Sequence, residues 1–401
     1  MKFLFENESF SFETLRTAGF ANYGGADLGE VIVTARGIPE GDETAWLKQW
    51  EATANRVAAI GERSLAAGHL ISAREAFLRA SNYYRTAEFF KRAAPIGDID
   101  VARLSGRSTQ TFIQAVQLLD SPFEIVDIPY ENTTLPGYLF LVDNSGKPRP
   151  TIIYNNGFDS TQEESYFAIG AAALRRGYNV LAFDGPGQGA ALRAAKITFR
   201  HDWENVLSPV IDFALTRKEI ARDQIALFGY SLGGYLVARA AAFDHRPAAL
   251  ILDDGLLDFH FAFEHMLPPF LLSWIDERQD ERADAVLQLL MSMKTGARWA
   301  IQNGMWTFGV TSPSEFVRQS RRYTLAGIAD DIRTATLVLN AENDQFLKGQ
   351  PQAIYALLNA PKKLVTLTEA EGAGEHCHMG AMSLAHQTIF DWLDDTLSDR
   401  G

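Results

Sequence analysis

Three residues that lie far apart in the sequence have the types and the order of a nucleophilic hydrolytic site: Ser231, Asp344 and His376. Ser231 is the centre of Gly229-Tyr-Ser-Leu-Gly233, which fits the pattern G-x-S-x-G. A serine hydroxyl attacks a carbonyl group when a base removes its proton, and a histidine held by a carboxylate is the common base. We therefore predict acyl-transfer chemistry with Ser231 as nucleophile, His376 as base and Asp344 as the orienting acid.

The elements around Ser231 must present its hydroxyl to the site. An apolar strand is predicted at 224–228 and a helix at 234–242, so the serine lies at a tight strand-to-helix turn. Glycines two residues away on either side remove Cβ atoms that would collide across this turn. The backbone N–H groups of Leu232 and Phe158 are the expected donors to an oxyanion.

The acid and the base each have a competitor nearby. Asp344 falls in the loop after a strand predicted at 335–339, and Glu342 is the reserve candidate. His376 follows a Gly-rich turn, with His378 two residues further on. The His376-Cys377-His378 run has no second Cys/His cluster elsewhere, so we expect no metal site.

Four regions of the chain differ in pattern. Residues 1–118 are predicted to be an N-terminal helical domain, 119–257 and 332–401 to be two parts of one α/β core, and 258–331 to be a helical insertion. The insertion is rich in aromatic residues and would lie over the carboxyl ends of the strands. We interpret it as a lid over the site.

Strands and helices alternate in the core, which predicts a mostly parallel sheet. The predicted strands cover residues 123–130, 135–142, 151–154, 179–183, 224–228, 249–252, 335–339 and 363–367.

Helix-capping signals place some helix boundaries. Asp42 is an expected N-cap, and Ser72 with Glu75 forms a capping-box signature. A further helix is predicted from Glu277 to Met293, inside the insertion.

Composition excludes several classes of function. The chain has 401 residues and a net charge of −13, which argues against nucleic-acid binding. Its single cysteine cannot form an intramolecular disulfide, and neither a secretory signal nor an apolar run long enough to span a membrane is visible. We expect a cytoplasmic protein.

The glycine-rich run 183–189 lacks G-x-G-x-x-G order, so it is interpreted as a tight loop and no cofactor is expected.

Several motifs together resemble one branch of the α/β-hydrolases. They are Asn156–Ser165, Phe183–Gly189, Gly229–Tyr235 and Glu371–Cys377, with N-terminal segments at 25–30, 72–79 and 83–88. That branch includes 2,6-dihydroxypseudooxynicotine hydrolase and the fungal yellowish-green polyketide-shortening hydrolases. The resemblance implies the α/β-hydrolase fold, an N-terminal helical domain that helps to enclose the site, and frequent dimerisation. It also implies hydrolysis of a carbon–carbon bond beside a ketone.

We therefore expect a homodimeric serine hydrolase that cleaves such a bond in a small aromatic or polyketide-like molecule. A carboxylesterase, or a peptidase, would use the same three residues, and a pathway protein that binds or cyclises a substrate without hydrolysis is a further alternative. Asp254, or its neighbour Asp253, could supply an extra acid at the sheet edge. Asp254, His260, Trp299 and Trp306 are the expected substrate contacts.

Overall fold

The computed structural model describes residues 1–398, which form two compact units. The helical unit comprises Met1–Phe123 together with Glu163–Ala172. The sheet unit comprises Glu124–Gln162 and the chain from Ala173 onward.

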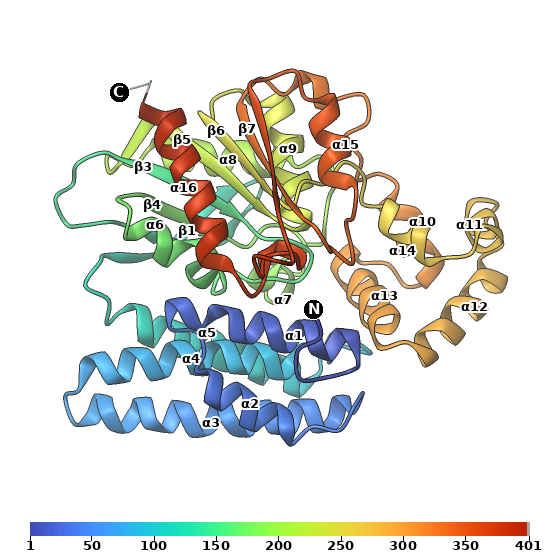
Figure 1. Cartoon of the computed structure of the whole chain (residues 1–401), viewed down its shortest axis with the longest axis horizontal. Helices are drawn as coiled ribbons and strands as arrows, with labels where there is room; N and C mark the ends of the chain where they lie inside the picture. The colour runs from blue at the N-terminus through green and yellow to red at the C-terminus, as the bar shows by residue number, and fades with distance from the viewer. Residues whose placement is uncertain (399–401) are drawn as a thin grey trace. The chain divides into compact units, whose positions relative to one another are not determined.

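Five α-helices make up most of the helical unit. They are α1 (Glu8–Gly19), α2 (Leu28–Arg36), α3 (Glu43–Ala66), α4 (Leu70–Glu88) and α5 (Ile99–Val116), with short turns η1 (Phe20–Tyr23) and η2 (Tyr166–Gly170) (Figure 1). Trp46 and Trp50 of α3 are fully buried, and the indole N–H of Trp46 donates to the carbonyl of Thr86 at 2.7 Å. These aromatic side chains form the core of the unit.

One predicted helix cap is confirmed and another is wrong. The carboxylate of Asp42 accepts the N–H of Ala45 at 2.9 Å, as an N-cap should. Ser72 does not cap a helix, because α4 already begins at Leu70. Gly68, with φ of 79°, ends the preceding helical segment, and the new helix has its N-cap at His69, three residues before Ser72.

Residues 163–172 pack within the helical unit, although the predicted boundaries placed them in the core. The ring of Phe167 lies 5.3 Å from that of Phe20 and 6.3 Å from that of Phe112. Glu164 is buried and pairs with Arg16 at 2.8 Å and with Arg85 at 3.4 Å. These partners are far away in the sequence, so local pattern alone does not show where the segment belongs.

The sheet unit is built on eight strands in the order β1-β2-β4-β3-β5-β6-β7-β8. β2 and β4 are antiparallel, and every pair from β4 through β3 and β5 to β8 is parallel. The strands are β1 (Phe123–Tyr130), β2 (Thr133–Phe140), β3 (Arg149–Asn155), β4 (Asn179–Phe183), β5 (Ile220–Tyr230), β6 (Ala249–Asp253), β7 (Ala335–Ala341) and β8 (Lys362–Leu367). The predicted mostly parallel sheet is confirmed, and each predicted strand overlaps one observed strand.

Helices connect the strands and pack on the sheet. They are α6 (Ala171–Leu174), α7 (Gly189–Arg193), α8 (Glu204–Leu215), α9 (Leu232–Phe243), α15 (Gln350–Leu357) and α16 (Met382–Ser398), with short turns η3 (Ala329–Asp331) and η4 (His376–His378). α9 packs against β5 and β6, while α16 packs against β6 and β7 (Figure 1). The central strand β5 is fully buried over its last six residues, so its carboxyl end is a rigid base for the turn that follows.

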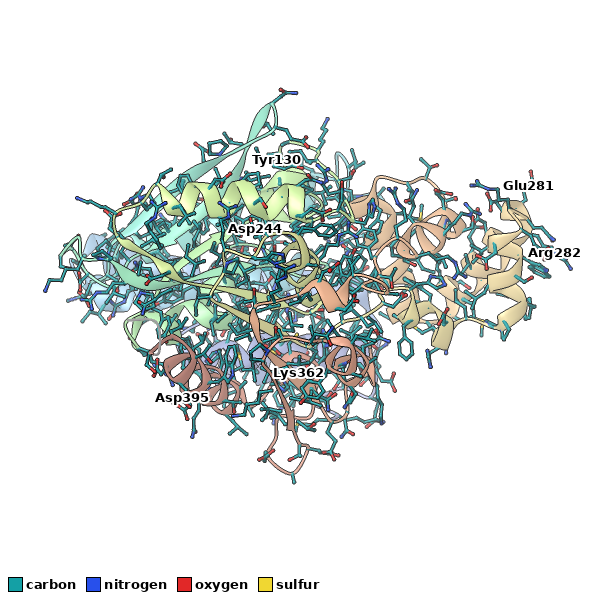
Figure 2. All side chains as sticks on the ribbon, turned by 90° about the horizontal axis from the view of Figure 1, so that it is seen from above. Tyr130, Asp244, Glu281, Arg282, Lys362 and Asp395 are labelled. Carbon is teal, nitrogen blue, oxygen red and sulfur yellow. The ribbon has the colours of Figure 1, made fainter. Side chains whose placement is uncertain are left out.

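An insertion between β6 and β7 carries the remaining helices. They are α10 (Phe261–Met266), α11 (Pro269–Asp276), α12 (Asp280–Met293), α13 (Thr295–Phe308) and α14 (Pro313–Ser320). A β-bridge between Asp258 and Thr324 joins the two ends of the insertion. Figure 2 shows Glu281 and Arg282 at its tip, away from the sheet. The helix predicted to begin at Glu277 begins at Asp280 instead, because Arg278 adopts a left-handed φ of 58°.

None of the helices in residues 1–398 is long and apolar enough to cross a membrane.

Candidate active site

Ser231 lies at a sharp turn between β5 and α9. Its φ of 58° and ψ of −122° form a conformation that non-glycine residues rarely adopt. A Cβ on Gly229 would lie 2.2 Å from the carbonyl oxygen of Gly233, and a Cβ on Gly233 would lie 2.5 Å from the carbonyl oxygen of Asn155. The two glycines are therefore needed because the backbone passes too close for any side chain, as the sequence pattern suggested.

His376 lies between Ser231 and Asp344. Its Nε2 is 2.8 Å from the hydroxyl oxygen of Ser231, and its Nδ1 is 2.7 Å from Oδ2 of Asp344. The other oxygen of Asp344 accepts the backbone N–H groups of Phe346 and Leu347, at 2.7 and 2.9 Å. Because a carboxylate can only accept, Nδ1 carries the proton and Nε2 is left to take the proton of the serine hydroxyl.

The reserve acid and the competing base lie elsewhere. A side-chain oxygen of Glu342 accepts the N–H of Glu369 at 2.8 Å, and Glu342 is exposed. His378 is fully buried, donates Nδ1–H to the carbonyl of Ala373 at 3.0 Å, and directs Nε2 to Asp253 at 3.2 Å. The structure thus brings Asp344 and His376 to Ser231.

Burial and charge shift the pKa values of this group. Burial disfavours the charged form of His376, but the charge of Asp344 and hydrogen bonds with Asp254 and Asp344 outweigh it and hold the pKa well above its usual value. Burial raises the pKa of the Asp344 carboxyl and the neighbouring Asp254 raises it further, although the charge of His376 opposes these shifts. The imidazolium form of His376 is therefore stabilised relative to that of an exposed histidine.

The two expected oxyanion donors lie in neighbouring turns. Leu232 is the first residue of α9, and a helix leaves the N–H groups of its first turn without intrahelical acceptors. The loop after β3 runs beside it, because a Cβ on Gly157 would lie 2.7 Å from the carbonyl oxygen of Tyr230 and 3.4 Å from the nitrogen of Leu232. Phe158 follows Gly157 directly, so this loop can supply a second N–H close to the first.

Two residues that the sequence interpretation gave no role hold this loop in place. The side-chain amide of Gln188 donates to the carbonyls of Asn156 and Gly157, at 2.7 and 3.0 Å. The carboxylate of buried Asp184 accepts from the side-chain amide of Asn156 at 2.9 Å. Both belong to the glycine-rich run 183–189, so the polar residues of that run were the available signal.

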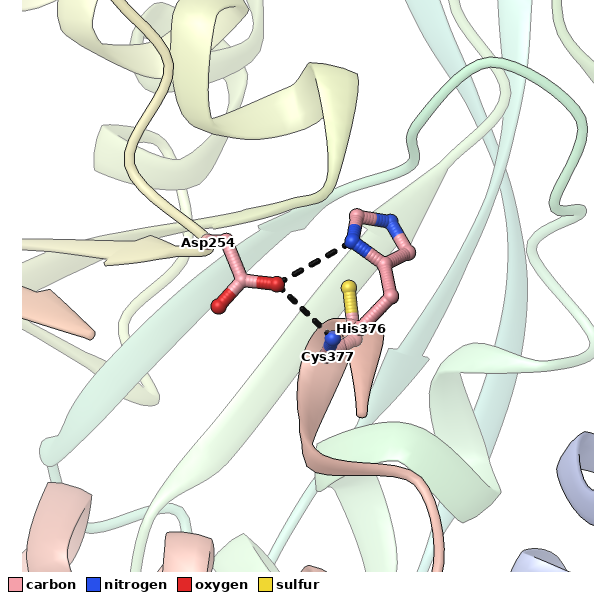
Figure 3. Close-up of side chains that lie close together, drawn as sticks. All are labelled: Asp254, His376 and Cys377. Carbon is pink, nitrogen blue, oxygen red and sulfur yellow. Dashed lines mark hydrogen bonds and ion pairs between the residues drawn. The ribbon is translucent and has the colours of Figure 1, made fainter. Parts of the chain in front are cut away.

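Asp254 lies against His376 and not among the side chains of the insertion. Its Oδ2 is 3.1 Å from Nδ1 of His376 and accepts the backbone N–H of Cys377 at 2.8 Å (Figure 3). Cys377 is buried and its thiol contacts the carbonyl oxygen of Asp253 at 3.7 Å. Burial raises the pKa of this thiol above its usual range, which keeps it protonated.

Within the described residues, two buried groups have potential metal-ligating atoms close together. One comprises Asp254, His376 and Cys377, and the other comprises Asp253, Asp254 and His378. They share Asp254, whose Oδ2 is already bonded to His376 and Cys377.

The three expected contacts in the insertion lie in different surroundings. The ring of Trp299 meets that of Phe158 edge-on at 6.0 Å. Trp306 stacks with the guanidinium of Arg193 at 5.1 Å. Nδ1 of buried His260 is 2.7 Å from the hydroxyl oxygen of Ser320.

Aromatic rings of the insertion surround Phe158. Phe259, Phe308 and Phe316 lie 5.5, 6.4 and 6.1 Å from it, between ring centroids. The side-chain amide of Asn303 donates to the carbonyl of Phe158 at 3.2 Å. The insertion therefore places an apolar, aromatic wall beside the loop that could bind an oxyanion.

Comparison with known proteins gives matches over nearly the whole chain. The model of the alpha/beta hydrolase family matches residues 156–385, and that of the FrsA-like esterases matches residues 39–250. The chain is 36% identical to hydrolase LUC6 of a Fusarium species, over 99% of this chain and 98% of that protein. It is 35% identical to 20-hydroxy-prefusarin hydrolase FUS2 of Gibberella moniliformis, over 98% of each.

A solved structure has the same fold over nearly the whole chain. The crystal structure of 2,6-dihydroxy-pseudo-oxynicotine hydrolase matches with a TM-score of 0.75 and 23% identity, over 95% of each chain. The resemblance stated from the motifs is thereby confirmed at the level of fold. With a family model covering more than half of the sequence, this chain belongs to the α/β-hydrolase family.

Proposed function

We propose that this protein is a serine hydrolase that cleaves a carbon–carbon bond next to a ketone in a small aromatic or polyketide-like substrate. The observation that carries the proposal is the hydrogen-bonded series Ser231–His376–Asp344, with distances of 2.8 and 2.7 Å. The strained backbone of Ser231 adds support, because such strain persists where function requires it.

The reaction begins at the ketone carbonyl. The hydroxyl oxygen of Ser231 bonds to the carbonyl carbon while its proton passes to Nε2 of His376. The carbonyl oxygen becomes an oxyanion beside the N–H groups of Leu232 and Phe158. After this step the oxyanion is negative and the imidazolium of His376 is positive. Asp344 stabilises the imidazolium.

Collapse of the tetrahedral intermediate breaks the carbon–carbon bond. The leaving carbon departs as an enolate or an electron-rich aryl carbanion. His376 then donates to this carbon the proton that it took from Ser231. Water, deprotonated by His376, then hydrolyses the acyl–Ser231 ester. The products are a carboxylic acid and a shortened ketone or arene, and no redox partner is needed.

The rings packed around Phe158 make the surroundings of the expected oxyanion loop apolar, which favours a small substrate that is itself largely apolar. Two similar proteins are named 20-hydroxy-prefusarin hydrolase and 2,6-dihydroxy-pseudo-oxynicotine hydrolase, and both names describe the hydrolysis of a small molecule.

A carboxylesterase is the second candidate, favoured by the match of residues 39–250 to FrsA-like esterases. Turnover of a matched pair, an aryl β-diketone and the corresponding aryl ester, separates the two. Cleavage of the diketone that disappears in Ser231→Ala supports carbon–carbon hydrolysis, whereas cleavage of the ester alone supports the esterase. Binding of both compounds without turnover would overturn both proposals and favour a non-hydrolytic pathway protein.

A further inference from the structure

A second carboxylate lies on the same nitrogen of His376 as Asp344. Asp254, the residue that follows β6, is fully buried, and its Oδ2 is 3.1 Å from Nδ1 of His376 (Figure 3). Oδ2 of Asp344 lies 2.7 Å from the same atom. Two acids from the ends of different strands therefore converge on one N–H.

Each of the two carboxylates has its own backbone donors. Asp344 accepts the N–H groups of Phe346 and Leu347, in the loop after β7. Asp254 accepts the N–H of Cys377, in the turn that carries His376. Because the donors differ, removal of one carboxylate leaves the other anchored.

A buried histidine, His378, lies beside the second carboxylate. Oδ1 of Asp254 lies 3.5 Å from Nε2 of His378, which is also 3.2 Å from Oδ1 of Asp253. Burial opposes the charged form of His378, but the charges of Asp253 and Asp254 raise its pKa to about 9. His378 is therefore cationic near neutral pH, and its charge favours the ionised form of Asp254 beside Asp344.

We propose that Asp254 is a second positioning acid for His376, which shares with Asp344 the hydrogen bond to Nδ1–H and the stabilisation of the imidazolium. The inference rests on the proposed function. No proton moves to Asp254: the proton of Ser231 goes to Nε2, and Nδ1–H stays on the ring between the two carboxylates.

Loss of the single orienting acid in a Ser-His-Asp site costs about 10⁴-fold in rate. With a second acid present, Asp344→Asn is expected to lower kcat/KM by only about 10²-fold, and Asp254→Asn by about 10-fold. The double variant is expected to lose about 10⁴-fold or more, which exceeds the product of the single effects because no carboxylate then remains. The substrate is whichever member of the matched pair the wild type cleaves.

Asp253→Asn is the matched control, because it removes a buried carboxylate from the same segment that faces His378 and not His376. Thermal unfolding of all four variants checks that they are folded. The acidic limb of the kcat/KM profile is expected to move to lower pH in Asp254→Asn and to move much less in Asp253→Asn, since only the first change removes a negative charge that lies directly on Nδ1.

Two outcomes would overturn the inference. One is an Asp344→Asn loss of about 10⁴-fold with no further loss in the double variant. The other is an Asp254→Asn variant that loses thermal stability while its pH profile stays that of the wild type, which assigns Asp254 to holding the Cys377 turn alone.

The proton NMR signal of Nδ1–H in His376 gives a readout independent of turnover. It is expected to move upfield in Asp344→Asn and in Asp254→Asn, and to move much less in Asp253→Asn. Full activity of Ser231→Ala would contradict the proposed function. The NMR signal would still show whether both carboxylates are hydrogen-bonded to the imidazole of His376. An unchanged signal in Asp254→Asn rejects the shared hydrogen bond itself.

Discussion

At the scale of single residues, Ser231 holds a backbone conformation that costs stability. Its φ of 58° and ψ of −122° suit glycine better than serine. Strain of this kind costs on the order of 1–3 kcal/mol and persists where the surrounding structure enforces it. Here the turn between β5 and α9 enforces it and directs the hydroxyl to Nε2 of His376.

Replacement of Ser231 separates this strain from the chemistry. Both Ser231→Ala and Ser231→Gly are expected to lower kcat by at least about 10⁴-fold, because the proposed nucleophile is gone. The glycine variant is expected to unfold with a free energy about 1 kcal/mol higher than that of the alanine variant, since glycine relieves the strain. Urea unfolding of the two proteins measures this difference, and equal stability would contradict it.

The buried ion pair of His378 predicts how stability depends on pH. A histidine whose pKa rises from about 6.5 in the unfolded chain to about 9 in the folded protein stabilises the fold fully below pH 6.5. That contribution is lost as the pH rises through 9, and it amounts to about 3 kcal/mol. We therefore expect the free energy of unfolding to fall between pH 7 and pH 10.

The pKa of His376 is also raised, so this residue also makes the free energy of unfolding fall as the pH rises. The contribution of His378 is therefore obtained by comparing a His378 variant with the wild type. His378→Gln is expected to be less stable than the wild type at pH 7 and to show a smaller decrease by pH 10. Denaturant titrations of both proteins at a series of pH values test this. Parallel curves for the two proteins would show that His378 is not charged in the folded state.

At the scale of elements, close backbone contacts hold the site together. A Cβ on Gly234 would lie 2.5 Å from the carbonyl oxygen of Asp254, and one on Gly233 would lie 2.5 Å from that of Asn155. The turn after Ser231 therefore packs closely against the backbone at the ends of β3 and β6. Its glycines allow three strand ends to meet at one point.

Substitution of these glycines should have the opposite effect to substitution of a glycine in open space. Gly233→Ala is expected to destabilise the fold by several kcal/mol, because the colliding atoms belong to rigid backbone. Gly106 lies within α5 with nothing near its missing Cβ, so Gly106→Ala is expected to stabilise by about 1 kcal/mol. Thermal unfolding measures both changes, and a neutral Gly233→Ala would contradict the close approach.

At the scale of the whole molecule, the helical unit is not continuous in sequence. Residues 163–172 complete it, with Phe167 only 1% exposed and Glu164 paired with Arg16 and Arg85. Removal of residues 1–118 would leave that ring and that carboxylate without their partners. The expected homodimer stays a prediction, which light scattering tests.

A truncated chain of residues 119–401 is therefore expected to be insoluble or to aggregate, because it exposes buried apolar surface and an unpaired buried charge. Expression of this fragment, with the full chain as control, measures the soluble yield. A soluble, monomeric fragment with a cooperative unfolding transition would show that the sheet unit folds independently.

The sequence alone determined the features that depend on local pattern and chain order. The alternation of strands and helices predicted the sheet, because alternating elements must form parallel pairs joined by crossovers. The G-x-S-x-G pattern and the order serine, aspartate, histidine were enough to select Ser231 and Asp344, which both lie within hydrogen-bond distance of the third residue, His376. These signals depend on residue type and spacing, which the sequence displays directly.

Only the tertiary structure decided which groups meet across long separations. Asp254 and His376 lie on different strand ends, and no local pattern indicates that an acid after β6 shares a nitrogen with one after β7. The return of residues 163–172 to the helical unit also depends on contacts with helices far away in the sequence. Such contacts follow from packing and from the pairing of buried charge, which involve the whole fold and leave no spacing in the sequence to be recognised.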